Sequence, residues 1–366
     1  MSLDKLFSPY TVKSLTIPNR IVMAPMTRSQ SPGGVATPEV ASYYARRAAA
    51  DVGLIITEGT GVDRPVSVND ENVPRFHGDQ SLAAWKSVVE AVHAEGGKIA
   101  PQLWHVGSVK NPTPGWVPPG KIDSPSGMSR PGKAFTDPLT DEEVADIIAT
   151  FARAAAETKA IGFDALELHG AHGYLIDQFF WDGTNTRTDR WGGTTIAQRS
   201  HFASELVKAV REAVGPDFVV ILRLSQWKQQ DYEAKLATTP EEMSAWLNPL
   251  SEAGVDVFHC SQRRFWEPEF AGSDMNFAGW AKKLTGKPSI TVGSVGLNAE
   301  FTASFRGAGA QAASLDDLLA RLETDEFDMV AVGRALLADP LWAKKVKEGR
   351  TAELADFDAR SLAVLT

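Results

Sequence analysis

The chain has 366 residues, of which 43% are hydrophobic, so it can build a substantial core in one large domain or two medium-sized ones. Its net charge of −9 provides no basic surface for nucleic acid or an anionic membrane, and we expect neither partner. The single cysteine, Cys260, excludes disulfide frameworks, thiolate zinc sites and cysteine-ligated iron–sulfur clusters, and it fits a cytoplasmic location.

The N-terminal segment shows no sign of a signal peptide. MSLDKLFSPY has neither a basic region nor an apolar one, and no apolar run along the chain approaches the roughly 20 residues that span a bilayer. Residues 6–20 contain two short extended pieces around the polar pair Lys13-Ser14. This pattern predicts a hairpin that closes the bottom of a barrel.

Eight short apolar runs, each bounded by polar residues or by Gly and Pro, are typical of buried parallel strands. They span residues 20–25, 52–58, 98–104, 163–169, 218–225, 255–261, 289–295 and 329–334. Helical periodicity lies between them, at residues 38–50, 79–94, 140–160, 194–214, 239–253, 274–284, 298–322 and 339–349. Thr140 and Glu143 have the spacing of a helix capping box. The alternation predicts a (β/α)₈ TIM barrel, an α/β fold, formed by residues 1–366 as a single domain, with a doubly wound sheet as the alternative.

The longest irregular segment, residues 106–138, is rich in Pro, Gly and Ser. It follows the third strand, so on a barrel it would hang over the catalytic face as a long loop. Its aromatic residue, Trp116, is interpreted as a packing anchor, with a cover over a pocket as the alternative.

The C-terminal ends of barrel strands face one shared pocket. The last two strands end in Gly293-Ser294 and Gly333-Arg334. Barrels commonly bind phosphate at this place through backbone N–H groups, and Arg334 adds a fixed positive charge. These two strand ends therefore predict a phosphate site.

Three further strand ends carry groups suited to a flat heterocycle. Arg223 has no obvious local carboxylate partner, so we expect its buried guanidinium to meet an anion or an electron-rich ligand. Thr27 offers a hydroxyl, and Gln102 offers an amide with both a donor and an acceptor. A flavin has an edge of alternating N–H and C=O groups, whereas the sequence has no GxGxxG after a strand and no P-loop motif.

The fourth strand ends in ELHGAHGYLIDQF, residues 167–179, for which three interpretations stay open. His169 and His172 could be ligands in a metal-dependent barrel hydrolase, although HxxH alone is a weak metal signal. They could be rim histidines beside a packed tyrosine. They could also donate hydrogen bonds, as neutral rings, to a carbonyl or nitro oxygen while Tyr174, protonated at pH 7, gives a proton to a developing carbanion.

Read together, the motifs NRIVMAPMTR, QLWH, ELHGAHGYLIDQFF, NTRTDRWGG and VAVGR resemble those of the Old Yellow Enzyme family of FMN-dependent ene-reductases, over nearly the whole chain. The resemblance implies tightly bound, non-covalent FMN, with NAD(P)H as co-substrate. It also implies ping-pong reduction of the C=C bond of α,β-unsaturated carbonyl or nitro compounds. A flavin-binding protein without turnover is a further alternative.

The resemblance assigns roles by position. It implies that hydride passes from flavin N5 to Cβ of the substrate and that Tyr174 protonates Cα. His169 and His172 would bind the activating oxygen, and Trp104 would line the substrate side. The remaining implied contacts are with FMN and involve Pro25, Met26, Thr27, Gly59, Gln102, Arg223, Gly293, Ser294, Gly333 and Arg334.

Residues 226–236 and 262–271 lie after the fifth and sixth strands and match no family pattern residue by residue, so the resemblance leaves substrate scope undetermined. Within the second loop, Phe265 and Trp266 are equally suited to lining the pocket and to packing. Arg263 and Arg264 are interpreted as a solvated surface pair rather than as contacts to a nicotinamide phosphate. The sequence makes no choice between monomer and homo-oligomer, or between NADH and NADPH.

Overall fold

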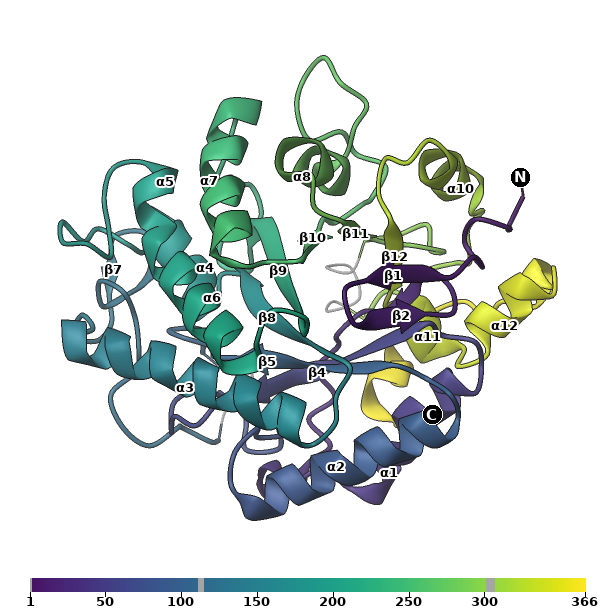
Figure 1. Cartoon of the computed structure of the whole chain (residues 1–366), viewed down its shortest axis with the longest axis horizontal. Coiled ribbons are helices and arrows are strands. Elements are labelled where there is room, and N and C mark those ends of the chain that lie inside the picture. Colours follow the sequence, from purple (N-terminus) through teal and green to yellow (C-terminus); the bar gives the residue numbers. More distant parts are fainter. Residues whose placement is uncertain (1, 111–114, 301–306) are drawn as a thin grey trace.

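The computed structural model describes residues 2–110, 115–300 and 307–366. In these ranges eight parallel strands close into a barrel that helices surround (Figure 1), in the order β3-β4-β5-β8-β9-β10-β11-β12, with β12 paired to β3. Each strand overlaps one predicted apolar run. The predicted TIM barrel is confirmed, and the closed pairing excludes a doubly wound sheet. The strands are β3 Ile21–Met23, β4 Leu54–Gly61, β5 Ile99–Trp104, β8 Ala165–His172, β9 Val219–Lys228, β10 Val257–Ser261, β11 Ser289–Val292 and β12 Met329–Val332.

The helices largely follow the predicted periodicity. The Thr140–Glu143 capping box is present, with Thr140 Oγ1 accepting from the Glu143 N–H at 3.2 Å. The helices are α1 Pro38–Ala48, α2 Asp79–Ala94, α3 Asp141–Ala160, α4 Leu175–Phe180, α5 Ile196–Arg199, α6 His201–Val214, α7 Pro240–Ala253, α8 Phe277–Thr285, α10 Asp316–Glu323, α11 Arg334–Ala338 and α12 Trp342–Lys347.

The helix expected over residues 298–322 is wrong for 307–315, while 301–306 lie outside the described residues. In place of helical bonding, Ala310 exchanges backbone hydrogen bonds with Phe357, and Leu297 bridges to Ala312. The alanine-rich composition favours a helix locally, but backbone hydrogen bonds to a distant segment override this preference. The helix expected over 339–349 is shorter, because α12 begins at Trp342 and ends at Lys347. Pro340 has no backbone N–H group, so the helical hydrogen bonds of α11 stop before it.

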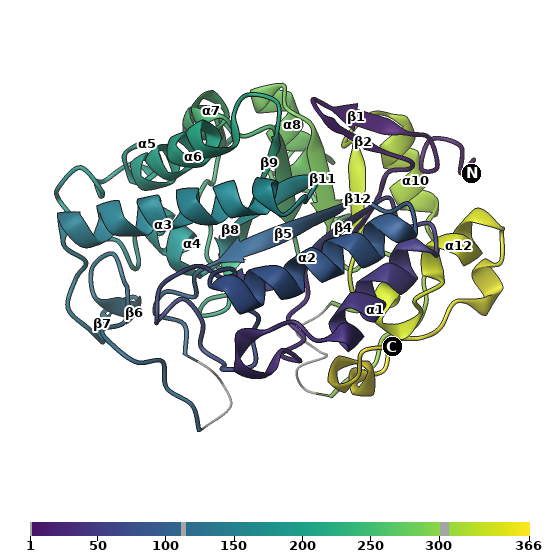
Figure 2. The same ribbon diagram turned by 60° about the horizontal axis from the view of Figure 1, so that its bottom comes forward.

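The predicted hairpin is formed by β1 Tyr10–Val12 and β2 Leu15–Ile17, which pair antiparallel. Leu15 and Ile17 are buried in one cluster with the lower inward-facing residues of the barrel, such as Leu54. Figure 2 shows the hairpin and the long loop at opposite ends of the barrel. The hairpin therefore closes the base and leaves the other end for a site.

The inward-facing side chains change from apolar at the base to polar at the mouth. Side chains alternate along a strand with a period of two, so every second residue points inward. The apolar cluster that contains Ala100, Ala165, Ile221 and Val257 fixes which residues those are. Continuing the period toward the mouth gives Gln102, Trp104, Glu167, His169, Arg223, His259 and Ser261.

The described part of the long loop is tied to the barrel by a buried polar centre and includes the small hairpin of β6 Met128–Arg130 and β7 Lys133–Ala134. His105 Nε2 lies 2.8 Å from Asp123 Oδ2, and Arg64 donates to the same carboxylate at 2.6 and 2.9 Å. Burial alone would raise the pKa of Asp123, but these hydrogen bonds lower it to about 2. Trp116 packs against a cluster that includes Trp104, as the packing interpretation predicts.

Candidate active site

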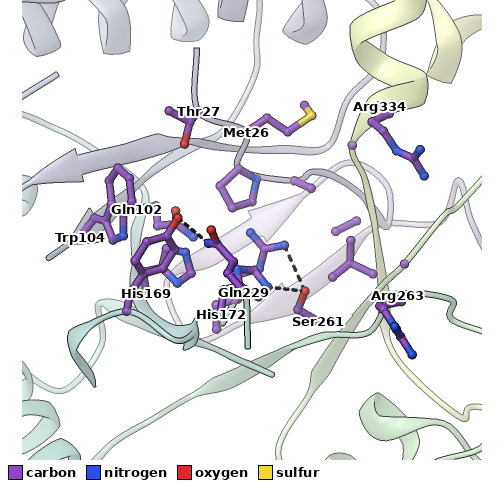
Figure 3. A pocket seen from close by; sticks show the side chains of 18 of the residues that line it. Met26, Thr27, Gln102, Trp104, His169, His172, Gln229, Ser261, Arg263 and Arg334 are labelled. Atoms are coloured by element: carbon purple, nitrogen blue, oxygen red, sulfur yellow. Dashed lines mark hydrogen bonds between the residues drawn. The ribbon is translucent and has the colours of Figure 1, made fainter. Parts of the chain in front are cut away.

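A cavity of about 470 Å³ opens where the barrel strands end (Figure 3). Of the site residues predicted from the sequence, all except Gly59 line it, although they come from six different strands and their following turns. Those lining residues are Pro25, Met26, Thr27, Gln102, Trp104, His169, His172, Tyr174, Arg223, Gly293, Ser294, Gly333 and Arg334.

Gly59 lies beside the cavity rather than in its lining. It pairs with Gln102 in the β4–β5 register, and a Cβ on Gly59 would lie 2.6 Å from the indole ring of Trp104. A real side chain essentially never approaches a carbon so closely, so the glycine leaves room for Trp104. Its contact with a flavin stays a prediction.

His169, His172 and Tyr174 form a compact aromatic group, here called the clamp. The ring of His169 lies 5.2 Å from that of His172 and 4.9 Å from that of Tyr174, both edge to face. The chain turns between them because His172 and Gly173 adopt left-handed backbone angles, with φ of 66° and 82°. The turn returns Tyr174 over the same cavity as His169.

The protonation states of the clamp follow from its burial. Burial lowers the pKa of both His169 and His172 well below the usual value, and the positive charge of Arg223 is the second cause. Burial also raises the pKa of Tyr174, against the opposing hydrogen bond from Gln229. At neutral pH the histidines are therefore neutral donors, and the tyrosine holds its proton.

A second wall of the cavity comes from residues that the sequence prediction missed. The indole of Trp227 stacks on His172 at 4.5 Å, and Gln229 Nε2 donates to Tyr174 Oη at 2.7 Å. Ser261 Oγ lies 2.8 Å from His172 Nε2. Trp227 and Gln229 belong to the segment that matched no pattern, whereas Ser261 could have been found from its inward position at the end of β10.

The turn of the clamp is held from below by a buried ion pair. Lys228 and Asp177 are both inaccessible to solvent, with Nζ and Oδ1 2.8 Å apart. Asp177 Oδ2 accepts from the Gly173 N–H at 2.7 Å, and Lys228 Nζ also donates to the carbonyl of Gln226. The pair thus joins α4 to the end of β9 beneath the turn.

Arg223 projects into the cavity from β9 and is 7% exposed. Its Nη2 lies 3.5 Å from Ser261 Oγ, and its Nε is buried without a partner among the described residues. Burial lowers its pKa, while the charge of Glu167 raises it. Glu167 is therefore the nearby carboxylate that the sequence reading did not find, although it lies two residues before His169 on the same inward face.

The residues predicted to bind phosphate line the cavity at the ends of β11 and β12, and their contact with a phosphate stays a prediction. A Cβ on Gly293 would lie 2.7 Å from the Gln262 carbonyl oxygen, so only glycine fits under the neighbouring loop. Arg334 lines the cavity and donates to the carbonyls of Glu300 and Ala299 and to Ser294 Oγ.

The loop over residues 262–271 differs from its prediction at Arg263. This side chain lines the cavity, with Nε 3.7 Å from Glu300 Oε2, rather than standing as a solvated surface residue. Phe265 is buried in the main core and Trp266 packs edge to face against it, 5.2 Å away. Neither aromatic lines the cavity, so packing is the better interpretation of both.

The described residues contain neither a cluster that could hold a metal ion nor a helix that could cross a membrane. Over 2–110, 115–300 and 307–366, no group of three or more His, Cys, Asp or Glu side chains is placed to hold a metal ion, so the donor set of the hydrolase alternative is missing there. Within the same ranges, no helix combines the length and the apolar character needed to cross a bilayer.

Comparisons with known proteins agree with this geometry. The family described as NADH:flavin oxidoreductase / NADH oxidase matches residues 5–353. An NADH oxidase of Thermoanaerobacter brockii is 37% identical over 360 residues, which are 95% of this chain and 52% of that protein, so the chain spans about half its length. Chanoclavine-I aldehyde reductase of Penicillium roqueforti is 34% identical over 354 residues, 95% of this chain and 90% of that one. Among solved structures, morphinone reductase has a TM-score of 0.80 at 30% identity, covering 99% of this chain and 93% of that one.

Proposed function

Because the chain belongs to the NADH:flavin oxidoreductase / NADH oxidase family, we propose that it is an FMN-dependent ene-reductase of the Old Yellow Enzyme type. It takes reducing equivalents from NAD(P)H and reduces the C=C bond of α,β-unsaturated carbonyl or nitro compounds. The observation that carries the proposal is the clamp, two neutral histidines and a protonated tyrosine over one cavity.

The cavity fits FMN by the chemistry of its donors. Arg223 Nε and His169 Nδ1 are buried without hydrogen-bond partners among the described residues, so each can form a hydrogen bond with a ligand. Bound FMN would supply hydride transfer between the nicotinamide and the alkene. The residues that would hold it are Pro25, Met26, Thr27, Gly59, Gln102 and Arg223 at the ring, and Gly293, Ser294, Gly333 and Arg334 at the phosphate.

His169 and His172 bind the activating oxygen of the substrate. A neutral imidazole can donate one hydrogen bond, and the edge-to-face arrangement brings both rings to the same part of the cavity. Negative charge develops on that oxygen during reduction. By analogy with an oxyanion hole, each donor stabilises it by about 3 kcal/mol.

Tyr174 is the proton donor for Cα. Gln229 donates to the tyrosine oxygen, so the hydroxyl proton is left free to point away from this amide and toward the substrate. The same hydrogen bond stabilises the oxygen as its proton leaves, because it opposes the effect of burial on the pKa.

Tyr174→Phe separates the two halves of the reaction. We expect reduction of FMN by NAD(P)H to be unchanged, because no proton from Tyr174 is needed, and reduction of an enone to slow by about 10²-fold or more. Stopped-flow absorbance of the flavin measures both halves. Tyr232→Phe is the matched control, since Tyr232 packs against Trp227 outside the cavity lining. Unchanged enone turnover in Tyr174→Phe would remove its assigned role, and purified protein without flavin absorption would overturn the proposal.

A further inference from the structure

A buried polar trio lies one layer below the clamp, formed by Gln102 on β5, Glu167 on β8 and His259 on β10. Their exposed fractions are 2%, 0% and 0%. Glu167 is the centre of the trio, because Oε1 accepts from Gln102 Nε2 at 2.7 Å and Oε2 lies 2.6 Å from His259 Nδ1. Of the three, Gln102 lines the cavity and the other two do not.

Glu167 determines which end of the Gln102 amide is presented to the cavity. An ionised carboxylate can only accept hydrogen bonds, so the amide group that faces it must be the NH₂. The carbonyl oxygen of Gln102 is then left as an acceptor at the cavity. Without Glu167 the two ends of the amide would be nearly equivalent, and Gln102 could offer either a donor or an acceptor to a ligand.

Glu167 also supplies a negative charge that acts on Arg223. Arg223 is buried, and no carboxylate forms an ion pair with it among the described residues. Glu167 interacts favourably with its charge through the barrel interior, where low polarity strengthens such effects. His259, its direct partner, is neutral at pH 7 because burial lowers the imidazole pKa. Glu167 therefore reduces the positive field that Arg223 contributes at the cavity.

We propose that Glu167 is a positioning residue for the flavin, acting through Gln102 and Arg223 without touching the ligand itself. It fixes the Gln102 carbonyl as the acceptor for the imide N–H of the ring. It also partly cancels the Arg223 charge, and so keeps the midpoint potential of the bound flavin lower than Arg223 alone would set it. This inference rests on the proposed FMN site.

The test measures the midpoint potential of the purified holoenzyme. Glu167→Gln keeps the size of the side chain and an acceptor for Gln102 but removes the charge, so we expect a more positive potential. Asp256→Asn is the matched control, because Asp256 is a buried carboxylate at the other end of β10, paired with Arg211 and Lys13. Its potential should equal that of the wild type. A wild-type potential in Glu167→Gln, or an equal shift in Asp256→Asn, would overturn the inference.

Glu167→Asp tests whether Glu167 orients the Gln102 amide for binding FMN. It also keeps the inference testable if Glu167→Gln does not fold. It keeps the charge and shortens the reach to Gln102, so we expect a dissociation constant for FMN at least several-fold higher, with a potential near the wild type. FMN bound as tightly as in the wild type would overturn the positioning part. A wild-type protein that binds no FMN would instead overturn the proposed function.

Discussion

Glu58 is a buried carboxyl group whose ionisation should set how the stability of the protein depends on pH. It lies on β4 with 1% exposure. Its Oε2 accepts from the backbone N–H groups of Arg28 and Ser29 at 2.8 and 3.1 Å, immediately after Thr27 in the cavity lining. Its Oε1 is buried without a partner among the described residues. Burial outweighs the two backbone hydrogen bonds and raises the pKa of Glu58 to about 7.

The sign and size of the effect follow from this pKa. A carboxyl group whose pKa is higher in the folded than in the unfolded state binds its proton more tightly when folded. Its stabilising contribution is fully present below the unfolded value of 4.5 and is lost as the pH rises through about 7. Each pH unit between these values is worth about 1.4 kcal/mol, so ionised Glu58 costs the folded state about 3 kcal/mol.

Glu58→Gln removes this dependence because glutamine does not ionise, while its carbonyl can still accept from Arg28 and Ser29. Urea unfolding of both holoproteins, followed by tryptophan fluorescence from pH 5 to pH 8, gives the two free energies of unfolding. The variant's free energy relative to the wild type should rise by about 2.5 kcal/mol over this range, since the unfolded carboxyl group is already mostly ionised at pH 5. Glu212→Gln, at an exposed position, should follow the wild type. Parallel curves for Glu58→Gln and wild type would show that Glu58 is ionised throughout and refute the reasoning.

Three further substitutions probe the site. Lys228→Met leaves Asp177 as a buried unpaired carboxylate and should lower the free energy of unfolding by about 3–5 kcal/mol in urea titrations, whereas a loss below 1 kcal/mol would contradict a structural role for the pair. His169→Ala removes a donor, so absorbance titration of the holoenzyme with a phenol should show about 10-fold weaker binding, and unchanged binding would argue against the clamp. Gly59→Ala forces a methyl group against Trp104 and should cost about 1–3 kcal/mol of stability, whereas unchanged stability would mean that the indole moves freely.

The barrel could be predicted because its evidence is local. A strand buried on both faces needs a continuous apolar run, and the connections at its ends need polar residues, Gly or Pro. Each strand can therefore be recognised from its own segment of the sequence. Residues 307–315 could not be predicted in the same way. Their alanine-rich composition favours a helix, while their bonding partner, Phe357, lies far along the chain.

The site residues also fall into those that local sequence patterns predict and those that they do not. The family motifs placed His169, His172 and Tyr174 correctly in one cavity, and a period of two along β8 and β10 would have added Glu167 and Ser261. Trp227 and Gln229 were out of reach for a physical reason. The β8–β9 register shifts between Gly170 and His172, which carries the second strand on to Lys228 and aims its last side chains at the clamp. No sequence pattern reveals such an irregularity.

This irregularity changes what the segment after residue 225 can be expected to do. The sequence matches no family pattern here and leaves the role of this segment in substrate scope undetermined. Because Trp227 stacks on His172 and Gln229 donates to the hydroxyl of Tyr174, the side chains that shape one wall of the cavity also orient the substrate donor and the proton donor. A substitution that widens this wall must therefore alter the rate of proton transfer as well as the range of alkenes accepted, so scope and catalysis are coupled at this wall.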